Sequence, residues 1–214
     1  MSPEGIPMRL LSRVDESPDP HFYRQPRLVH HIDDATIEAL TQVYRERLPA
    51  GGEILDLMSS WVSHLPDEIA YSRVAGLGMN AEELGANPRL NDRVVHDLNA
   101  NPTLPYPDTA FDAVTIAVSV QYLVRPVEVF AEIHRVLRPG GEALVAVSHR
   151  TFPTKAVALF RTLPPAERPR VVESYFARAG GFEEPVCIDR SPQCSPPADP
   201  LWVVTARRGV RVRR

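Results

Sequence analysis

Polar side chains gather where short apolar segments of the sequence end. Asp56, Ser59 and Ser60 come at the end of the first segment, and Asp97 comes at the end of the third. Carboxylates accept hydrogen bonds, and hydroxyls both donate and accept them, so these residues can bind the polar groups of a small molecule. If the segments are parallel strands, their carboxyl ends meet at one edge of a sheet, where open α/β sheets bind ligands. We therefore expect a ligand site at that edge.

Four more residues near strand ends are candidates for contact with a substrate. Gln121 and Tyr122 follow the fourth segment, His149 follows the fifth, and His64 lies in the loop after the first. Amide, phenol and imidazole groups orient a substrate through hydrogen bonds, and an imidazole also exchanges protons near neutral pH. Structural alternatives stay open: Tyr122 packing over the next helix, His149 exposed to solvent, and His64 capping a helix.

The single lysine and three residues near the N-terminus complete the substrate candidates. Lys155 carries a compact ammonium charge that can bind an anion, although a position on a solvated helix explains it as well. Tyr23, Arg27 and His31 belong to a segment that we expect either to close over a ligand or to pack on the domain without touching one.

A metal site is not expected. Cys187 and Cys194 have no histidine nearby at the spacing of zinc ligands. The adjacent His30 and His31 point in different directions on most backbones. Neither cysteine has the surroundings of a nucleophile.

Hydrophobic periodicity indicates the elements that would position these residues. The clearest helix covers 126–137, because apolar residues recur along it at helical spacing before the Pro-Gly-Gly stop at 139–141. Strand and helix segments alternate along the middle of the chain, which is typical of a parallel sheet covered on both faces. The short connection between the last two strands favours an antiparallel pair. The sequence predicts an α/β fold with a doubly wound, mostly parallel sheet and an antiparallel C-terminal strand, with helices at 33–48, 126–137 and 171–179 and strands at 54–57, 72–77, 93–96, 113–118, 142–148, 185–189 and 201–205.

Length and charge limit the domain organisation and the partners. A chain of 214 residues, 43% hydrophobic and 24% charged, is suited to one globular domain. We expect an N-terminal arm at 1–32, a single domain at 33–206 and a basic tail at 207–214. The net charge of −3 does not favour nucleic acid, and no apolar run is long enough to span a membrane. The start of the chain lacks the features of a signal peptide, so we expect a cytoplasmic protein with a small-molecule substrate and make no prediction of its oligomeric state.

Two blocks of the chain carry a resemblance to a known family. Residues 104–114, LPYPDTAFDAV, and residues 135–141, RVLRPGG, resemble motifs of the class I S-adenosylmethionine-dependent methyltransferases, especially the type 11 group. The resemblance covers roughly 51–148 and implies a Rossmann-like fold with S-adenosylmethionine as the cofactor. It also implies that Asp97 accepts a hydrogen bond from the adenine amino group and that Leu98 offers a backbone amide. Asp56 would steady the loop after the first strand and reach the amino group of the cofactor.

The chain departs from the family at two cofactor-binding elements. The family's glycine-rich loop has glycines where Met58, Ser60 and Val62 stand, and its ribose-binding acid would fall on Gly78. Serine hydroxyls in the loop and the Asn80 amide are the polar groups available there instead. The cofactor residues expected on this basis are Asp56, Met58, Ser59, Ser60, Gly76, Gly78, Asn80, Asp97, Leu98 and Ser119.

Two hypotheses of function follow. The first is methyl transfer from S-adenosylmethionine to a small, apolar or aromatic acceptor; no catalytic residue is assigned, because this in-line displacement needs chiefly alignment. The second is a protein of the same fold that has lost catalysis and serves in binding or regulation, as Met58, Val62 and Gly78 suggest. A nicotinamide-dependent oxidoreductase is disfavoured, because the Gly-x-Gly-x-x-Gly turn is missing after the first strand.

Overall fold

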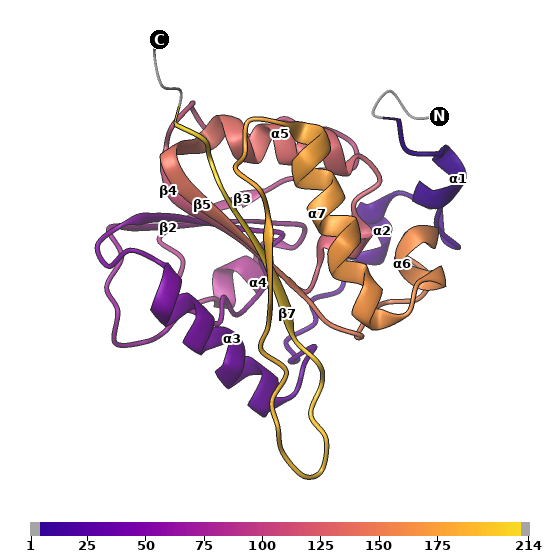
Figure 1. Ribbon diagram of the computed structural model, residues 1–214, viewed down its shortest axis with the longest axis horizontal. Helices are drawn as coiled ribbons and strands as arrows, with labels where there is room; N and C mark the ends of the chain where they lie inside the picture. The colour runs from indigo at the N-terminus through magenta and orange to yellow at the C-terminus, as the bar shows by residue number, and fades with distance from the viewer. Residues whose placement is uncertain (1–4, 211–214) are drawn as a thin grey trace.

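One sheet of seven strands, in the order β3-β2-β1-β4-β5-β7-β6, runs through the molecule (Figure 1). The structure is a computed structural model that describes residues 5–210. Strands β1 to β5 pair in parallel, and β7 pairs antiparallel with both β5 and β6. The predicted α/β fold, with its mostly parallel sheet and antiparallel C-terminal strand, is confirmed. The strands are β1 (Glu53–Leu57), β2 (Arg73–Gly78), β3 (Asp92–Val95), β4 (Phe111–Ala117), β5 (Leu137–Val147), β6 (Val186–Asp189) and β7 (Trp202–Arg207).

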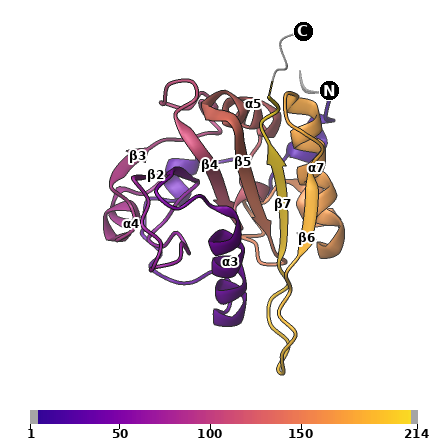
Figure 2. The same ribbon diagram turned by 60° about the vertical axis from the view of Figure 1, so that its left-hand side comes forward.

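Helices cover both faces of the sheet (Figures 1 and 2). Buried side chains of α3 and α4 belong to one apolar cluster, and those of α1, α5, α6 and α7 belong to the other. This is the doubly wound arrangement that alternating strand and helix segments predict. The helices are α1 (Met8–Leu11), α2 (Asp19–Phe22), α3 (Asp34–Arg47), α4 (Ala81–Ala86), α5 (Pro126–Val136), α6 (Ala158–Thr162) and α7 (Arg168–Ala179), with short 3₁₀ turns at η1 (Val120–Tyr122) and η2 (Pro165–Glu167).

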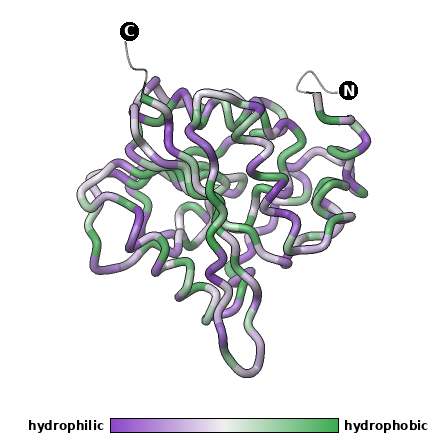
Figure 3. Tube along the Cα trace, in the orientation of Figure 1, coloured by the Kyte–Doolittle hydropathy of each residue, from purple (hydrophilic) through white to green (hydrophobic). Residues whose placement is uncertain are grey.

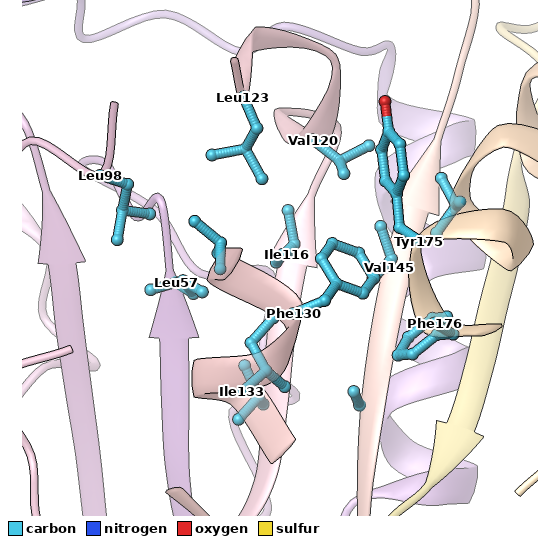
Figure 4. Packing of buried hydrophobic residues seen from close by; sticks show 14 of the residues in the cluster. Leu57, Leu98, Ile116, Val120, Leu123, Phe130, Ile133, Val145, Tyr175 and Phe176 are labelled. Carbon is cyan, nitrogen blue, oxygen red and sulfur yellow. The ribbon is translucent and has the colours of Figure 1, made fainter. Parts of the chain in front are cut away.

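Helix α5 lies at the centre of the larger cluster. Helical spacing brings Phe130 and Ile133 to one face, where both are completely buried (Figure 4). The Phe130 ring lies edge-on to Phe176 and Tyr175, with ring centroids 4.7 and 5.5 Å away. Burying a side chain of this size contributes about 1.5–3 kcal/mol. The helix predicted at 126–137 is confirmed but ends one residue earlier, because β5 begins directly after it.

Helix α3 begins at the predicted cap. The Asp33 carboxylate accepts a hydrogen bond from the Thr36 N–H at 2.9 Å, which satisfies one of the free donors of the first turn. Leu40 and Tyr44 are completely buried in the second cluster. The helix predicted at 33–48 is confirmed. Figure 3 shows that hydrophobic residues concentrate along the strands in the middle of the molecule.

The crossover from β1 to β2 has an irregular backbone. Residues 58–72 are all described and contain no helix, whereas β4 and β5 are joined through α5. Three serines in this crossover, Ser59, Ser60 and Ser63, donate side-chain hydrogen bonds to the carboxylates of Asp56 and Glu83. The crossover therefore supplies polar groups to the edge of the sheet.

The N-terminal segment contributes to the core as well as covering the domain. It contains α1 and α2, which the sequence analysis did not predict, and it buries Ile6, Leu11 and Ile32. Ile6 and Leu11 join one apolar cluster and Ile32 joins the other, and the three residues follow no helical period. Hydrophobic periodicity therefore could not reveal their burial.

The C-terminal end continues the sheet. Arg207 is the last residue of β7, and Arg208 forms an isolated antiparallel bridge with Phe182. Residues 211–214 of the predicted basic tail lie outside the described residues, and the predicted boundaries at 32/33 and 206/207 stay predictions. Within residues 5–210, no helix combines the length and the hydropathy needed to cross a bilayer.

Candidate ligand-binding cleft

A cleft of about 360 Å³ opens beyond the carboxyl ends of the parallel strands. Strand order reverses between β1 and β4, and the loops after these strands diverge to leave room for a ligand. This volume lies in the range of small-molecule sites. The predicted residues that line the cleft are Tyr23, Arg27, His31, Asp56, Met58, Ser59, Ser60, His64, Gly78, Asp97, Leu98, Ser119 and Tyr122.

Three residues with left-handed backbone conformations line this cleft. Met58 has φ +60°, His64 has φ +55° and Val118, at the end of β4, has φ +44°. Such values are uncommon outside glycine and are strained for a β-branched residue. Strain of this kind persists only where the surrounding contacts enforce it, and it gathers at functional sites. The loop after β1 thus keeps a backbone that suits glycine at Met58 while carrying a side chain.

Asp56 fixes the start of this loop. Its carboxylate is buried and accepts hydrogen bonds from the hydroxyls of Ser59 at 2.5 Å and Ser63 at 2.7 Å. Burial raises the pKa of Asp56 to about 6, and the two serine hydrogen bonds oppose that rise. Ser63 also accepts a hydrogen bond from the Asn87 side chain at 2.8 Å. Ser59 and Ser63, which stand beside the positions of the family's glycines, therefore hold the loop through a buried polar network.

The same loop explains why position 78 is glycine. A Cβ atom on Gly78 would lie 2.2 Å from the backbone oxygen of Ser59, which is an impossible contact. The Ser59 N–H in turn donates to the Leu77 carbonyl at 2.8 Å. The loop thus lies directly on the end of β2, so an acid at position 78 and this loop conformation are mutually exclusive.

Glu83 is a cleft residue that the sequence analysis missed. It lies in the first turn of α4, and its carboxylate accepts hydrogen bonds from the Ser60 hydroxyl at 2.6 Å and the Arg27 backbone N–H at 2.8 Å. These contacts join the β1 loop, α4 and the N-terminal segment. Glu83 lies five positions after Gly78, where the family has its ribose-binding acid. Only the approach of the β1 loop and the N-terminal segment brings Glu83 to the cleft, so no sequence pattern indicated it.

Asp97 and the residues after it form the wall beyond β3. The Asp97 carboxylate accepts hydrogen bonds from the backbone N–H groups of Asn99 at 2.9 Å and Ala100 at 3.2 Å. The Asn99 amide donates to Asp19 at 2.7 Å and to the Tyr122 carbonyl at 2.9 Å. Asn99 and Asp19 also line the cleft and were not predicted.

Aromatic rings line another part of the cleft. His30 stacks on Trp61 with centroids 5.0 Å apart, and the Trp61 indole N–H donates to the Val29 carbonyl at 3.1 Å. Phe152, after β5, lies 5.2 Å from His31 and stacks on Tyr122 at 5.7 Å. Phe152 was not predicted, although its place after the fifth strand was an available signal.

Two side chains in this region, Arg27 and His64, each contain a buried nitrogen atom without a hydrogen-bond partner among the described residues. The Arg27 guanidinium lies 4.4 Å above the Phe22 ring and 5.4 Å from that of Phe152, and its Nη1 atom is buried without a hydrogen-bond partner in the described residues. The His64 Nδ1 atom is buried in the same unpaired state. Burial lowers the pKa of His64 to about 4, and nearby His30 and His31 lower it further. His64 does not cap a helix; its carbonyl accepts a hydrogen bond from Thr41.

The other predicted residues do not line the cleft. A Cβ on Gly76 would meet the Leu90 side chain, so this glycine serves packing. Asn80 caps α4 and donates to the Tyr23 and Arg24 carbonyls. Gln121 is buried and donates to the Val118 carbonyl, and His149 pairs with Asp199 at 3.0 Å.

Lys155 is not on a solvated helix. It is completely buried, and its Nζ lies 3.2 Å from the Asp15 carboxylate and 3.1 Å from that of Asp19. It also donates to the Ser17 carbonyl at 2.7 Å. The anions that Lys155 binds are therefore carboxylates of the N-terminal segment. These contacts hold that segment against the end of the cleft. Within residues 5–210, no three histidine, cysteine or acidic residues are grouped to bind a metal ion.

Comparison with protein families finds a match for part of the chain. Residues 59–145 match the model of a methyltransferase domain of type 11. A curated relative, a demethylmenaquinone methyltransferase from Clavibacter sepedonicus, is 33% identical over 116 residues, which are 52% of this chain and 46% of that protein. The chain spans less than half the length of the curated relatives it matches.

Solved structures share the fold at low sequence identity. A [4+2]-cyclase superposes with a TM-score of 0.62 at 19% identity, covering 89% of this chain and 92% of that one. A phosphoethanolamine N-methyltransferase from Haemonchus contortus, in complex with S-adenosyl-L-methionine, has a TM-score of 0.57 at 14% identity and covers 81% and 52%. These likenesses agree with the Rossmann-like fold implied by the sequence.

Proposed function

We propose that this chain, a member of the type 11-like class I methyltransferases, transfers a methyl group from S-adenosylmethionine to a small molecule. The observation that carries the proposal is the cleft at the carboxyl ends of β1, β2 and β4, with Asp97 on its wall, in the region that matches the methyltransferase domain. When bound, S-adenosylmethionine supplies an electrophilic methyl group on a sulfonium sulfur.

The described residues fit this cofactor, though with a changed set of contacts. Two backbone N–H groups orient the Asp97 carboxylate, so that it can accept a hydrogen bond from an adenine amino group. The unpaired Nη1 of Arg27 suits the carboxylate of the methionine moiety. Glu83 would accept the ribose hydroxyls in place of an acid at position 78, because each carboxylate oxygen has a second lone pair.

Besides binding the cofactor, the protein must align the methyl donor with the acceptor and exclude water from the site. The N-terminal segment, held by Lys155 and by the bond from Asn99 to Asp19, lines the cleft with Tyr23 and Arg27. A covered site keeps donor and acceptor in line and shields the reaction from solvent. No side chain is assigned as a catalytic residue, because in-line transfer from a sulfonium needs few groups besides these.

Titration calorimetry with S-adenosylmethionine and S-adenosylhomocysteine tests the proposal. Wild-type protein should bind both, and Asp97→Ala should weaken binding about tenfold or more through loss of a charge-assisted hydrogen bond. Asp108→Ala, which removes an exposed carboxylate paired with Arg135, is the matched control and should bind as wild type does. Transfer of a labelled methyl group to a component of a cell extract would then identify the acceptor.

A non-catalytic role is the second candidate. It is favoured by the side chain of Met58 in the loop where the family has glycine, and by the loss of the acid at Gly78. One structural neighbour is a [4+2]-cyclase, so a likeness of fold leaves the reaction open. Absence of binding by folded protein, with either ligand at millimolar concentration, would support this role and contradict the first.

A further inference from the structure

We propose that the part of the cleft lined by Trp61 and Phe152 binds a planar aromatic molecule through ring contacts, and that a hydroxyl of this molecule hydrogen-bonds to Nδ1 of His64. The inference rests on the proposed function only in taking this molecule as the methyl acceptor. Its binding is a separate property of the cleft.

Ring side chains form much of this part of the cleft. His30 stacks on Trp61, and His31 and Tyr122 contact Phe152. All five line the cleft, and they come from the N-terminal segment, the β1 loop and the segments after β4 and β5. Aromatic side chains favour offset or edge-on contact with another ring. Four separate segments thus supply surfaces suited to a flat, unsaturated ligand.

His64 supplies the polar group that such a ligand would need. Its Nδ1 is buried and has no partner among the described residues, and a buried polar atom is costly until it is paired. The Thr41 hydroxyl donates to the His64 carbonyl and so anchors the left-handed backbone there, and the His64 ring lies edge-on to the His30 ring with centroids 6.3 Å apart. Its lowered pKa keeps the ring neutral, so one ring nitrogen carries a lone pair that accepts from a hydroxyl.

The charges around the rings argue against a cationic ligand. The Arg27 guanidinium lies over the Phe22 ring and near that of Phe152, whereas Arg150, which also lines the cleft, is paired with Asp199. A ligand cation beside Phe152 would meet the Arg27 guanidinium instead of a free aromatic face. A neutral or weakly acidic hydroxyl on an aromatic ring avoids this repulsion and satisfies His64 as well.

Calorimetric titration with 2-naphthol and with naphthalene separates the hydroxyl from the ring. Wild-type protein should bind 2-naphthol about three- to tenfold more tightly, the value of one net hydrogen bond. His64→Leu should remove this preference and leave naphthalene affinity within about twofold. His64→Asn, a residue that tolerates left-handed backbone, keeps a polar atom near the Nδ1 position and should retain part of the preference.

Phe152→Leu provides the complementary test. It should weaken both ligands by a similar factor, because the ring contact is common to them. Melting temperatures of all variants establish that each is folded. Equal affinity of wild type for the two ligands, a preference that survives in His64→Leu, or binding of neither would overturn the inference.

The outcomes separate this inference from the proposed function. Preference for 2-naphthol in a protein that binds no S-adenosylmethionine would support the aromatic site and contradict methyl transfer. Binding of S-adenosylmethionine without any binding of 2-naphthol, in its presence or absence, would leave the proposed function intact and overturn the aromatic site.

Discussion

Two crossovers of this sheet join neighbouring parallel strands in opposite ways. The connection from β4 to β5 passes through α5, which buries an apolar face, and it contributes only its first residues to the cleft. The connection from β1 to β2 has no helix in residues 58–72, and it is held by hydrogen bonds to the buried Asp56 carboxylate. The β4–β5 connection therefore stabilises the fold through apolar packing, whereas the irregular β1–β2 connection places polar groups and strained backbone at the cleft.

The largest expected effect is in the helical crossover. Phe130→Ala should lower the free energy of unfolding by about 3–5 kcal/mol, through lost burial and the cavity that remains. Urea denaturation measures this loss. Because Phe130 does not line the cleft, affinity for S-adenosylhomocysteine should stay within twofold of wild type. A loss below about 1 kcal/mol would contradict the central place of α5 in the core.

Gly78→Asp restores the family's acid and tests the irregular crossover. It should destabilise the protein by about 3 kcal/mol, since even its Cβ would lie 2.2 Å from the Ser59 carbonyl oxygen and the loop must move. The matched control is Gly85→Ala in α4, where a Cβ meets nothing within 4 Å. That variant should gain about 0.5–1 kcal/mol. Equal stability of Gly78→Asp and wild type would show that the loop is not fixed on β2.

Asp56 should make the stability of the irregular crossover depend on pH. Its pKa in the folded protein is raised from 3.8 to about 6, so folding favours the protonated carboxyl. This contribution is complete below about pH 4 and is lost as the pH rises through about 6. Relative to Asp56→Asn, which does not titrate, wild type should lose about 2–3 kcal/mol between about pH 4 and pH 7. A difference that stays constant with pH, in urea denaturation of both proteins, would refute this.

Ser63→Ala should have the smallest effect of the series and the most informative one. It removes a hydroxyl that donates to Asp56 and accepts from Asn87, and should cost about 1–2 kcal/mol because both partners are buried. Unlike Phe130→Ala, it should also weaken cofactor affinity, as the loop lines the cleft. Ser72→Ala, an exposed hydroxyl that donates to the Gly52 carbonyl, serves as control and should change stability by less than about 0.5 kcal/mol.

Sequence patterns predicted the regular elements well and the cleft only in part. Apolar periodicity located α3 and α5 within one or two residues, since a buried face imposes a repeat on the residues that form it. The ends of the strands then indicated which loops meet at the sheet edge. Glu83 escaped prediction because only the approach of separate segments brings it to the cleft, whereas Phe152 could have been predicted from its place after the fifth strand. Lys155 was misjudged because its partners lie 140 and 136 positions away, at Asp15 and Asp19.

The sequence by itself determined the α/β fold, because a strand or helix with one buried face needs a local repeat of apolar residues. It also predicted a ligand site beyond β1 and β3, where the structure has its cleft, because parallel strands end at a common edge. Only the tertiary structure decided that Gly78 excludes an acid, that serine hydroxyls bind the Asp56 carboxylate, and that Nδ1 of His64 has no hydrogen-bond partner within residues 5–210. These properties depend on distances between segments that are remote in sequence, and a local sequence pattern does not indicate such distances.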